Sequence, residues 1–285
     1  MRITVLGGDE RSIKLAKLLL EDHHIKVFGF DKEKIDCLEV NESLVIALEG
    51  SDIVIGPIPC SHDNEYLNTP LYSYEIGLRE IFESMKKEQI FIGGKITKEV
   101  LGIANTYSIR TIDLMKREEL AVLNAIPTAE GAIQTAMETM DITLHGSNAM
   151  ILGFGRVGKV LAKTLYGIGA NVFVEARNHN DLAWIKAYGY VPIDLKDLED
   201  FLGKVDVIFN TIPIKILDEK MLHNINKGTL VIDLASTPGG VDFEKAKELK
   251  IKTIWALGLP GKVAPSTAAT VIKDTIHNII EELGV

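Results

Sequence analysis

Short apolar runs recur along the chain, and each is followed by a stretch whose apolar positions repeat with the period of a helix. This alternation predicts parallel strands joined by helices, and it occurs in both halves of the chain. We therefore expect an α/β protein with two doubly wound, Rossmann-like domains. In the first half the predicted strands are residues 3–6, 25–30, 52–56, 90–94 and 109–114. In the second half they are residues 148–153, 171–176, 205–210, 229–235 and 252–257.

Two helices organise the predicted domains. Pro127 and Thr128 are typical of the start of a helix, and strong helix formers follow, so we place a bridging helix at residues 128–142. The C-terminal segment begins with a proline and a Ser/Thr cap, and it should return toward the first domain. Its apolar face consists of Ala268, Val271, Ile272, Ile276, Ile279 and Ile280. The expected domains are residues 1–125 with 266–285, on the substrate side, and residues 126–265, which bind the nucleotide, with an interdomain cleft.

Composition narrows the class of protein. Of 285 residues, 46% are hydrophobic and 25% charged, which is ordinary for a globular protein. The net charge of -9 is spread along the chain, so we expect no nucleic acid or membrane partner. Cys37 and Cys60 lie in no metal-binding or disulfide pattern, and no signal peptide is visible. These features predict a cytoplasmic protein without a metal site, whose partner is a small molecule or another protein.

A glycine motif follows the first strand of the second half. Gly153, Gly155 and Gly158 form G-x-G-x-x-G between a strand and a helix, with Arg156 and Val157 inside the motif. The first glycine permits a tight turn, the second lets a diphosphate approach the backbone, and the third lets helix and strand pack closely. The motif in this context predicts a dinucleotide-binding site.

The next strand bears on the choice of dinucleotide. NAD sites usually carry an acid at the end of this strand, whereas the 2′-phosphate of NADP favours an arginine there. The acid's position falls on Ala176, followed by Arg177 and Asn178. Glu175 is one residue early, and the period of two turns its side chain to the other face. The strand favours NADP, with NAD as the alternative if the alignment is shifted by one residue.

The first domain begins with a partial copy of the motif, GGDER at residues 7–11. Asp9 stands at the start of the helix, where a carboxylate caps the helix and repels an anion. We therefore expect this domain to bind no nucleotide of its own. Arg11, in the first turn of that helix, is a candidate to bind an anionic substrate.

Six stretches together resemble one family, the A subunit of dipicolinate synthase from endospore-forming bacteria. They are GGDER, NAIPTAEGAIQ (124–134), GFGRVGK (153–159), NTIP (210–213), VIDLASTPGG (231–240) and ALGLPGKVAPSTA (256–268). The likeness spans nearly the whole chain, and the stretches around 124–134 and 256–268 are its specific signatures. The domain layout also resembles that of D-2-hydroxyacid dehydrogenases and S-adenosylhomocysteine hydrolases.

The resemblance implies an NADP-dependent dehydrogenase that oxidises dihydrodipicolinate to dipicolinate during sporulation, together with a B subunit. We also expect a homo-oligomer. Two alternatives stay open: an enzyme of the D-2-hydroxyacid dehydrogenase type, and a nucleotide-binding subunit without catalytic activity. The first alternative needs a catalytic histidine, and none of the seven histidines has a convincing catalytic setting.

The expected site residues follow from strand ends and from the family. Loops after the carboxyl ends of parallel strands line the site in doubly wound folds. By analogy with the family, Thr211, Ile212 and Pro213 lie beside the adenosine, and Ser236, Gly258, Leu259 and Pro260 lie nearer the nicotinamide. Candidates to bind the two substrate carboxylates are Arg11, Lys95, Thr128, Lys262, Ser266 and Thr267. The candidate catalytic residues are Glu130, Lys262 and Ser236, with Glu130 as a proton acceptor or a helix-capping acid. Asp233, at a strand end, could be catalytic or could bind backbone N–H groups.

Overall fold

The computed structural model describes residues 1–35, 38 and 40–284. The chain divides into two compact units, which we describe separately. Unit 1 comprises Met1–Ala121 and Ala264–Val285, and unit 2 comprises Val122–Val263. Cys37 lies outside the described residues.

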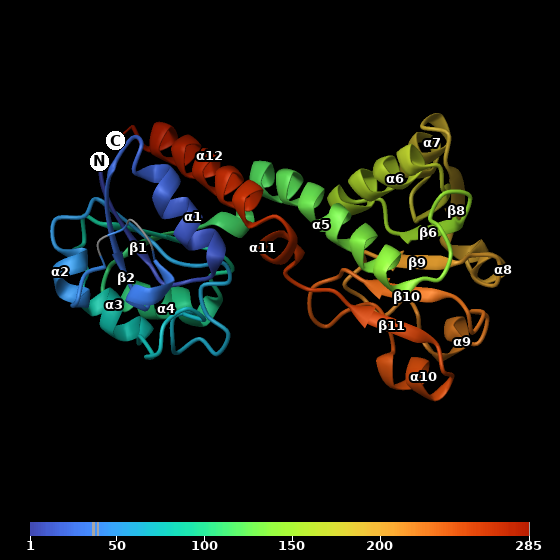
Figure 1. Ribbon diagram of the computed structural model, residues 1–285, viewed down its shortest axis with the longest axis horizontal. Coiled ribbons are helices and arrows are strands. Elements are labelled where there is room, and N and C mark those ends of the chain that lie inside the picture. The colour runs from blue at the N-terminus through green and yellow to red at the C-terminus, as the bar shows by residue number, and fades with distance from the viewer. Residues whose placement is uncertain (36–37, 39, 285) are drawn as a thin grey trace. The chain divides into compact units, whose positions relative to one another are not determined.

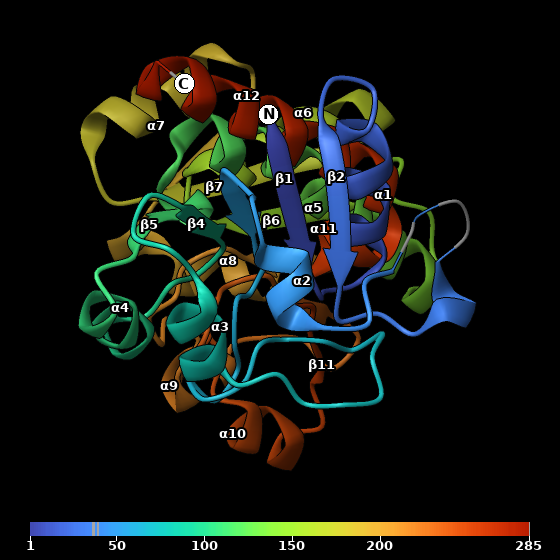
Figure 2. The same ribbon diagram turned by 90° about the vertical axis from the view of Figure 1, so that its left-hand side faces the viewer.

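Among its described residues, unit 1 holds a five-stranded parallel sheet with the order β2-β1-β3-β4-β5. Figure 2 looks onto this unit, where β1 and β2 run side by side. Its elements are β1 (Arg2–Leu6), α1 (Glu10–Leu19), β2 (His24–Phe28), η1 (Lys32–Lys34), α2 (Leu44–Leu48), β3 (Ile53–Ile55), α3 (Leu78–Ser84), β4 (Ile90–Gly93), α4 (Lys98–Thr106), β5 (Arg110–Asp113), η2 (Leu114–Lys116) and α12 (Pro265–Leu283).

Within the described residues of unit 2, six parallel strands form a sheet with the order β11-β10-β9-β6-β7-β8 (Figure 1). This is the order of a dinucleotide-binding doubly wound fold. Its elements are β6 (Asn148–Leu152), α6 (Arg156–Ile168), β7 (Asn171–Ala176), α7 (His179–Ala187), β8 (Val191–Asp194), η3 (Leu195–Asp197), α8 (Glu199–Leu202), β9 (Val207–Asn210), α9 (Glu219–Leu222), β10 (Leu230–Asp233), α10 (Phe243–Glu248), β11 (Lys252–Trp255) and α11 (Leu259–Val263).

Both sheets are buried on both faces, which explains why their strands read as short apolar runs. In β4, Ile90 and Ile92 pack with α1 and α12, whereas Phe91 packs with the helices of the other face. In β6, Ala149 and Ile151 contact the cluster formed with α5 (Glu118–Thr139) and α6, while Met150 and Leu152 face α8 and α9. The prediction of two doubly wound α/β domains is confirmed.

Helix α5 (Glu118–Thr139) begins well before the predicted bridging helix and contributes residues to both units. The predicted start at Thr128 is wrong, because Pro127 lies inside the helix rather than in its first turn. Proline usually breaks a helix since it lacks an N–H group. Here the buried Ala125, Ala129 and Ala132 hold the two sides of the proline in one core-facing stripe.

Strand β8 was not among the predicted strands. Its sequence, Val191-Pro192-Ile193-Asp194, contains a proline, and it is the edge strand beside β7. Proline is tolerated at a sheet edge, where its missing N–H removes no bond between strands. A short run with one fully buried apolar side chain carries too weak a periodicity to be read as a strand.

The C-terminal helix returns to unit 1, as predicted, and packs along α1 (Figure 1). Ala268, Val271, Ile272, Ile276 and Ile279 of its apolar face are buried, and Ile280 is partly buried. The guanidinium of Arg117 donates two hydrogen bonds to the carboxylate of Glu282. The predicted Ser/Thr cap is wrong, because Ala264 occupies the cap position and no side chain caps α12.

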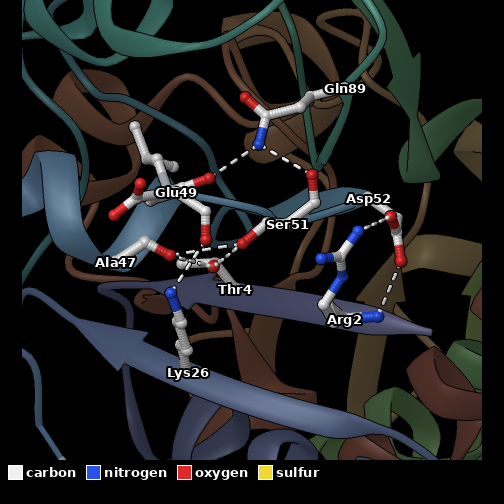
Figure 3. A network of polar contacts seen from close by, with 9 residues as sticks. Arg2, Thr4, Lys26, Ala47, Glu49, Ser51, Asp52 and Gln89 are labelled. Atoms are coloured by element: carbon white, nitrogen blue, oxygen red, sulfur yellow. Dashed lines mark hydrogen bonds and ion pairs between the residues drawn. The ribbon is translucent and has the colours of Figure 1, made fainter.

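A buried polar network ties β1 to α2 and to the segment before β3 in unit 1 (Figure 3). Thr4 Oγ1 lies 2.6 Å from the carbonyl oxygen of Ala47, to which it donates, and 2.5 Å from Ser51 Oγ. Gln89 Nε2 donates to the carbonyl oxygens of Leu48 and Ser51, both at 2.7 Å. These bonds satisfy polar groups that the folded unit removes from water.

We expect Thr4→Val to destabilise the protein by about 1 kcal/mol, because the hydroxyl's hydrogen bonds are lost while the side-chain volume is kept. The midpoint of urea-induced unfolding measures this change. Thr111→Val in β5 is the matched control, since the structure gives the Thr111 hydroxyl no hydrogen bond among the described residues. Equal midpoints for Thr4→Val and Thr111→Val would contradict a stabilising role for the network.

Candidate functional site

The glycine loop between β6 and α6 has the geometry that a diphosphate requires. Gly153 has φ of +93°, a conformation that favours glycine. A Cβ atom on Gly158 would lie 2.2 Å from the carbonyl oxygen of Gly153, so the third glycine allows α6 to approach the loop. A Cβ atom on Gly155 would meet nothing within 4 Å. The first and third glycines thus serve the packing of the chain, whereas the second faces open space.

The N-terminus of α6 is available to an anion. Gly155 is its cap residue, and no side chain caps the helix there. The backbone N–H groups of a helix's first turn attract negative charge, and a carboxylate or phosphate can accept their hydrogen bonds. Helix α1 in unit 1 differs, because Asp9 caps it by accepting from the Arg11 N–H at 3.0 Å. The predicted capping role of Asp9 is confirmed.

The loop after β9 lies directly against the glycine loop. Thr211 Oγ1 donates to the carbonyl oxygen of Leu152 at 2.8 Å. A Cβ atom on Gly153 would lie 2.7 Å from Thr211 Oγ1 and 2.9 Å from Ile212 Cγ1. The order of the strands reverses between β6 and β9, and ligands of doubly wound folds bind at such a switch point. The structure therefore brings the glycine motif together with Thr211 and Ile212, while Pro213 is exposed beside them.

A buried Asn–Asp pair, which the sequence motifs did not predict, connects the loops after β9 and β10 through hydrogen bonds. Asn210 Nδ2 donates to Asp233 Oδ1 at 2.8 Å and to the carbonyl oxygen of Ile212 at 3.0 Å, and Asn210 Oδ1 accepts from the Ile212 N–H. Asp233 also accepts from the N–H groups of Ala235 and Gly240. Both side chains are fully buried. The second interpretation of Asp233 is confirmed, since it binds backbone N–H groups.

The four side chains of residues 175–178, at and after the end of β7, have different surroundings. Ala176 is buried in the cluster that contains Val172 and Val174, whereas Phe173 packs on the other face. Glu175 therefore points to the face opposite Ala176, as the period of two predicted. Arg177 is exposed.

Asn178 caps α7, with its Oδ1 accepting from the Asp181 N–H at 2.7 Å and its Nδ2 donating to the Asp181 carboxylate at 2.6 Å. Its side-chain amide is thus engaged within the protein. A nucleotide contact from Asn178 would have to use its backbone or compete with this cap.

The remaining predicted nucleotide-side residues differ in exposure. Ser236 and Gly258 are exposed, and Pro260 is partly buried. Leu259 is buried in the core of unit 2, where a Cβ atom on Gly131 of α5 would lie 3.2 Å from the Leu259 Cβ. The side chain of Leu259 therefore packs α11 against α5, which explains why a glycine stands at position 131.

The candidate substrate and catalytic residues are divided between the units. Thr128 and Glu130 lie on α5, and Lys262 lies at the end of α11, all in unit 2. Thr128 Oγ1 donates to the carbonyl oxygen of Asn124 at 2.7 Å. Glu130 is exposed and stands in the middle of α5, so its predicted alternative role at the helix N-terminus is wrong. Lys262 is exposed.

In unit 1 the candidates are Arg11, Lys95, Ser266 and Thr267, and the last three are exposed. The guanidinium of Arg11 donates to both carboxylate oxygens of Asp9 and to the carbonyl oxygen of Ile58, and its side chain is 13% exposed. The Arg11 guanidinium is thus already paired with a carboxylate of its own unit. Cys60 is buried in this unit, and burial raises the pKa of its thiol to about 12.

Comparisons with known proteins match both units. The family described as the N-terminal domain of the dipicolinate synthase A subunit matches residues 2–115, and the NAD binding domain of D-isomer specific 2-hydroxyacid dehydrogenases matches residues 119–242. The dipicolinate synthase A subunit of Bacillus subtilis is 33% identical over 99% of this chain and 97% of its own. Among the described residues, no helix is long and apolar enough to cross a membrane.

Two solved structures share the whole fold. The dipicolinate synthase A subunit from Bacillus halodurans is 31% identical, with a TM-score of 0.92 over 98% of this chain and 97% of that one. The A chain of dipicolinate synthase from Bacillus subtilis is 32% identical, with a TM-score of 0.90 over 100% of this chain and 97% of that one.

The doubly wound nucleotide-binding unit, with its glycine loop at the switch point, and the match to a dehydrogenase NAD binding domain define an oxidoreductase of the nicotinamide-dependent dehydrogenase class. Identity of 33% over nearly the entire chain then gives the family. The chain belongs to the family of dipicolinate synthase A subunits.

Proposed function

We propose that this protein oxidises dihydrodipicolinate to dipicolinate in the cytoplasm, with NADP as the hydride acceptor and together with a B subunit. The names of its relatives, which are dipicolinate synthase A subunits, support dihydrodipicolinate as the substrate. The observation that most directly supports nucleotide binding is the open backbone at Gly155. It lies beside the N-terminus of α6, which no side chain caps. Gly153, Gly155, Thr211 and Ile212 would hold the nucleotide there.

The end of β7 supports NADP over NAD. Ala176, at the position where NAD sites carry an acid, is buried and apolar, and exposed Arg177 follows it. A guanidinium binds phosphate through charge-assisted hydrogen bonds, and no carboxylate at position 176 repels the phosphate. The carboxylate of Glu175 is directed to the opposite face and toward Gly153.

The reaction needs two groups to leave the substrate ring. When bound, the nicotinamide accepts the hydride, which carries the electron pair of the broken C–H bond. A base must take the proton, and the exposed carboxylate of Glu130 is our candidate. Loss of both makes the ring aromatic. Lys95, Lys262 and the hydroxyls of Thr128, Ser266 and Thr267 would fix the two substrate carboxylates, with Ser236 beside the nicotinamide.

Turnover tests this proposal directly. Purified protein mixed with dihydrodipicolinate and NADP should reduce the nucleotide, which the absorbance of reduced nicotinamide reports, and addition of the B subunit should increase the rate. Equal binding of oxidised and reduced NADP without turnover, with and without the B subunit, would instead favour a non-catalytic nucleotide-binding subunit.

We expect Arg177→Ala to weaken NADP binding by about 1–3 kcal/mol and to leave NAD binding unchanged, because only NADP has a 2′-phosphate to pair with the guanidinium. Calorimetric titration with each nucleotide measures both affinities. Lys186→Ala is the control, since Lys186 is an exposed cation in the last turn of α7. Equal weakening of NADP and NAD by Arg177→Ala would show that the phosphate assignment is wrong.

The match of residues 119–242 to the D-isomer specific 2-hydroxyacid dehydrogenases favours a second candidate, oxidation of a 2-hydroxy acid. That reaction needs a base near the hydroxyl group, and the nucleotide-binding loops described above contain no histidine. Assays with small 2-hydroxy acids and either nucleotide separate the two candidates.

A further inference from the structure

Glu175 is an acidic side chain buried directly behind the glycine loop. It is 0% exposed, and its Oε2 accepts a hydrogen bond from the Gly153 N–H at 3.2 Å. The other carboxyl oxygen, Oε1, is buried and has no hydrogen-bond partner among the described residues. The same Gly153 N–H also donates to the backbone oxygen of Glu175, at 3.2 Å. One backbone N–H of the loop is therefore shared between the strand and this carboxyl group.

A charged group in this place is unusual on physical grounds. Burying a carboxylate with half of its hydrogen-bonding capacity unmet is costly, and a hydrophobic side chain would fill the same space without that cost. The charge also lies behind a loop whose expected ligand is a diphosphate. An anion behind the loop opposes binding of an anion in front of it.

The surroundings determine when Glu175 carries its charge. Burial raises the pKa of its carboxyl group, and Asp194 of β8 raises it further, while the hydrogen bond from Gly153 and the charge of Arg177 lower it. Arg177 directly follows β7, and Asp194 is the last residue of β8. Asp194 is held ionised at the start of η3, where its own pKa is lowered by the hydrogen bond from the Lys196 N–H and by the Lys196 charge.

We infer that Glu175 is a positioning residue of the nucleotide site, which anchors the glycine loop through Gly153 and whose charge sets how tightly that loop binds the diphosphate. The inference rests on the proposed nucleotide-binding function. The neutral carboxyl group keeps the anchor and adds no repulsion. The ionised group keeps the anchor but opposes the ligand, so nucleotide binding is coupled to uptake of a proton.

Two variants separate the anchor from the charge. Glu175→Gln keeps an oxygen acceptor for Gly153 and cannot ionise, whereas Glu175→Met removes both the acceptor and the charge at similar length. The affinity for NAD and for NADP is measured from about pH 5 to about pH 9. Because variant and unchanged protein are compared with the same nucleotide, any titration of the nucleotide's own phosphates cancels.

We expect the affinity of Glu175→Gln relative to the unchanged protein to rise with pH across this range, and to reach at least about fivefold at the alkaline end. Glu175→Met should bind about three- to tenfold more weakly than Glu175→Gln at every pH, because the loop has lost its side-chain anchor. Asp194→Asn is the matched control for removal of a nearby charge. Since the Asp194 charge raises the pKa of Glu175, its removal should move the loss of affinity to lower pH without changing the size of that loss.

Measurements on the unchanged protein avoid any folding defect of a variant. Titration with NAD in buffers of different ionisation enthalpy should reveal net proton uptake in the pH range where Glu175 titrates. Thermal unfolding gives a second readout: the raised pKa means that stability is fully present below the ordinary value of 4.5 and is lost as pH rises through the folded-state pKa. Glu175→Gln should therefore gain melting temperature over the unchanged protein as the pH rises.

The outcomes distinguish this inference from the proposed function. A Glu175→Gln to wild-type affinity ratio that stays at one across the range, with no proton uptake, would overturn the role of Glu175 while leaving the nucleotide site in place. Absence of nucleotide binding by the unchanged protein at every pH would overturn both. Equal affinities of Glu175→Gln and Glu175→Met would show that the side chain of residue 175 does not anchor the glycine loop through Gly153.

Discussion

Gly155→Val should abolish binding of the pyridine nucleotide while the protein remains folded. Residue 155 has an extended backbone, with φ of -79° and ψ of -161°, which valine adopts readily. Nothing lies within 4 Å of the position that its Cβ would take, so we expect the substitution to leave the packing of the protein intact. The branched side chain would project into the space that the diphosphate needs.

The expected loss of affinity is at least about 100-fold, because displaced phosphates forfeit hydrogen bonds worth about 1.5–3 kcal/mol each when one partner is charged. Calorimetric titration with NADP and NAD measures the loss, and circular dichroism with thermal unfolding checks the fold. Gly167→Val is the matched control, since Gly167 lies near the end of α6, the helix that Gly155 caps, and also has open space at its Cβ position. Near-native affinity in a folded Gly155→Val protein would refute the diphosphate site.

The three glycines of the motif differ in what a side chain would do. At Gly153 the positive φ and the contact with Thr211 make any side chain strained, and at Gly158 the added atom would meet a backbone oxygen. Substitutions at these two positions would disturb the fold together with the site. Gly155 alone among the three allows binding to be removed without that ambiguity.

The sequence predicted ten of the strands because central parallel strands must be apolar on both faces, and such runs stand out between helical segments. The prediction of elements failed where tertiary packing or strand pairing overrides the local sequence pattern. Pro127 marks a helix start in most contexts, yet α5 continues through it because small buried residues on both sides pack into the core. Strand β8 was not predicted, because an edge strand with a proline is defined by its pairing with β7 rather than by its composition.

The site was predictable to the extent that backbone conformation determines it. Glycine spacing predicted the loop, and the period of two placed Glu175 opposite Ala176. The hydrogen bond from Gly153 to the Glu175 carboxyl group could not be predicted, since it depends on how two neighbouring strands are staggered. Arg11 shows the same limit: its partner Asp9 is two residues away, but the contact with Ile58 is set by the tertiary fold.

The Asn210–Asp233 pair was missed for a related reason, although a signal exists. Both residues end buried strands, β9 and β10, and these strands are neighbours in the sheet with Asn210 paired in register to Asp233. Polar residues at the carboxyl ends of adjacent strands are directed to the edge where the ligand binds. Had the strand order been derived first, the two side chains could have been placed together.

Asp233→Asn should lower both the stability of the protein and its affinity for the nucleotide. Asp233 accepts hydrogen bonds on both oxygens, from Asn210 and Ala235 on one side and from Gly240 on the other. An asparagine amide has one accepting oxygen, so in either orientation its NH2 group faces a buried donor. Each unmet buried donor costs about 1–3 kcal/mol, and relief of that clash should move the loops after β9 and β10.

The affinity for NADP should fall by at least about tenfold in Asp233→Asn, because a shift of the Thr211–Ile212 segment disturbs the surface that lines the glycine loop. Urea unfolding and calorimetric titration measure the two effects. Asp206→Asn is the informative control: Asp206 accepts from the Asn148 N–H at 2.7 Å, at the amino end of β6 and away from the loops. It should lose stability without losing affinity, whereas Asp233→Asn should lose both. If the two variants lost stability alike and both kept full affinity, the Asn210–Asp233 pair would be a structural element of the sheet and not a support of the nucleotide site.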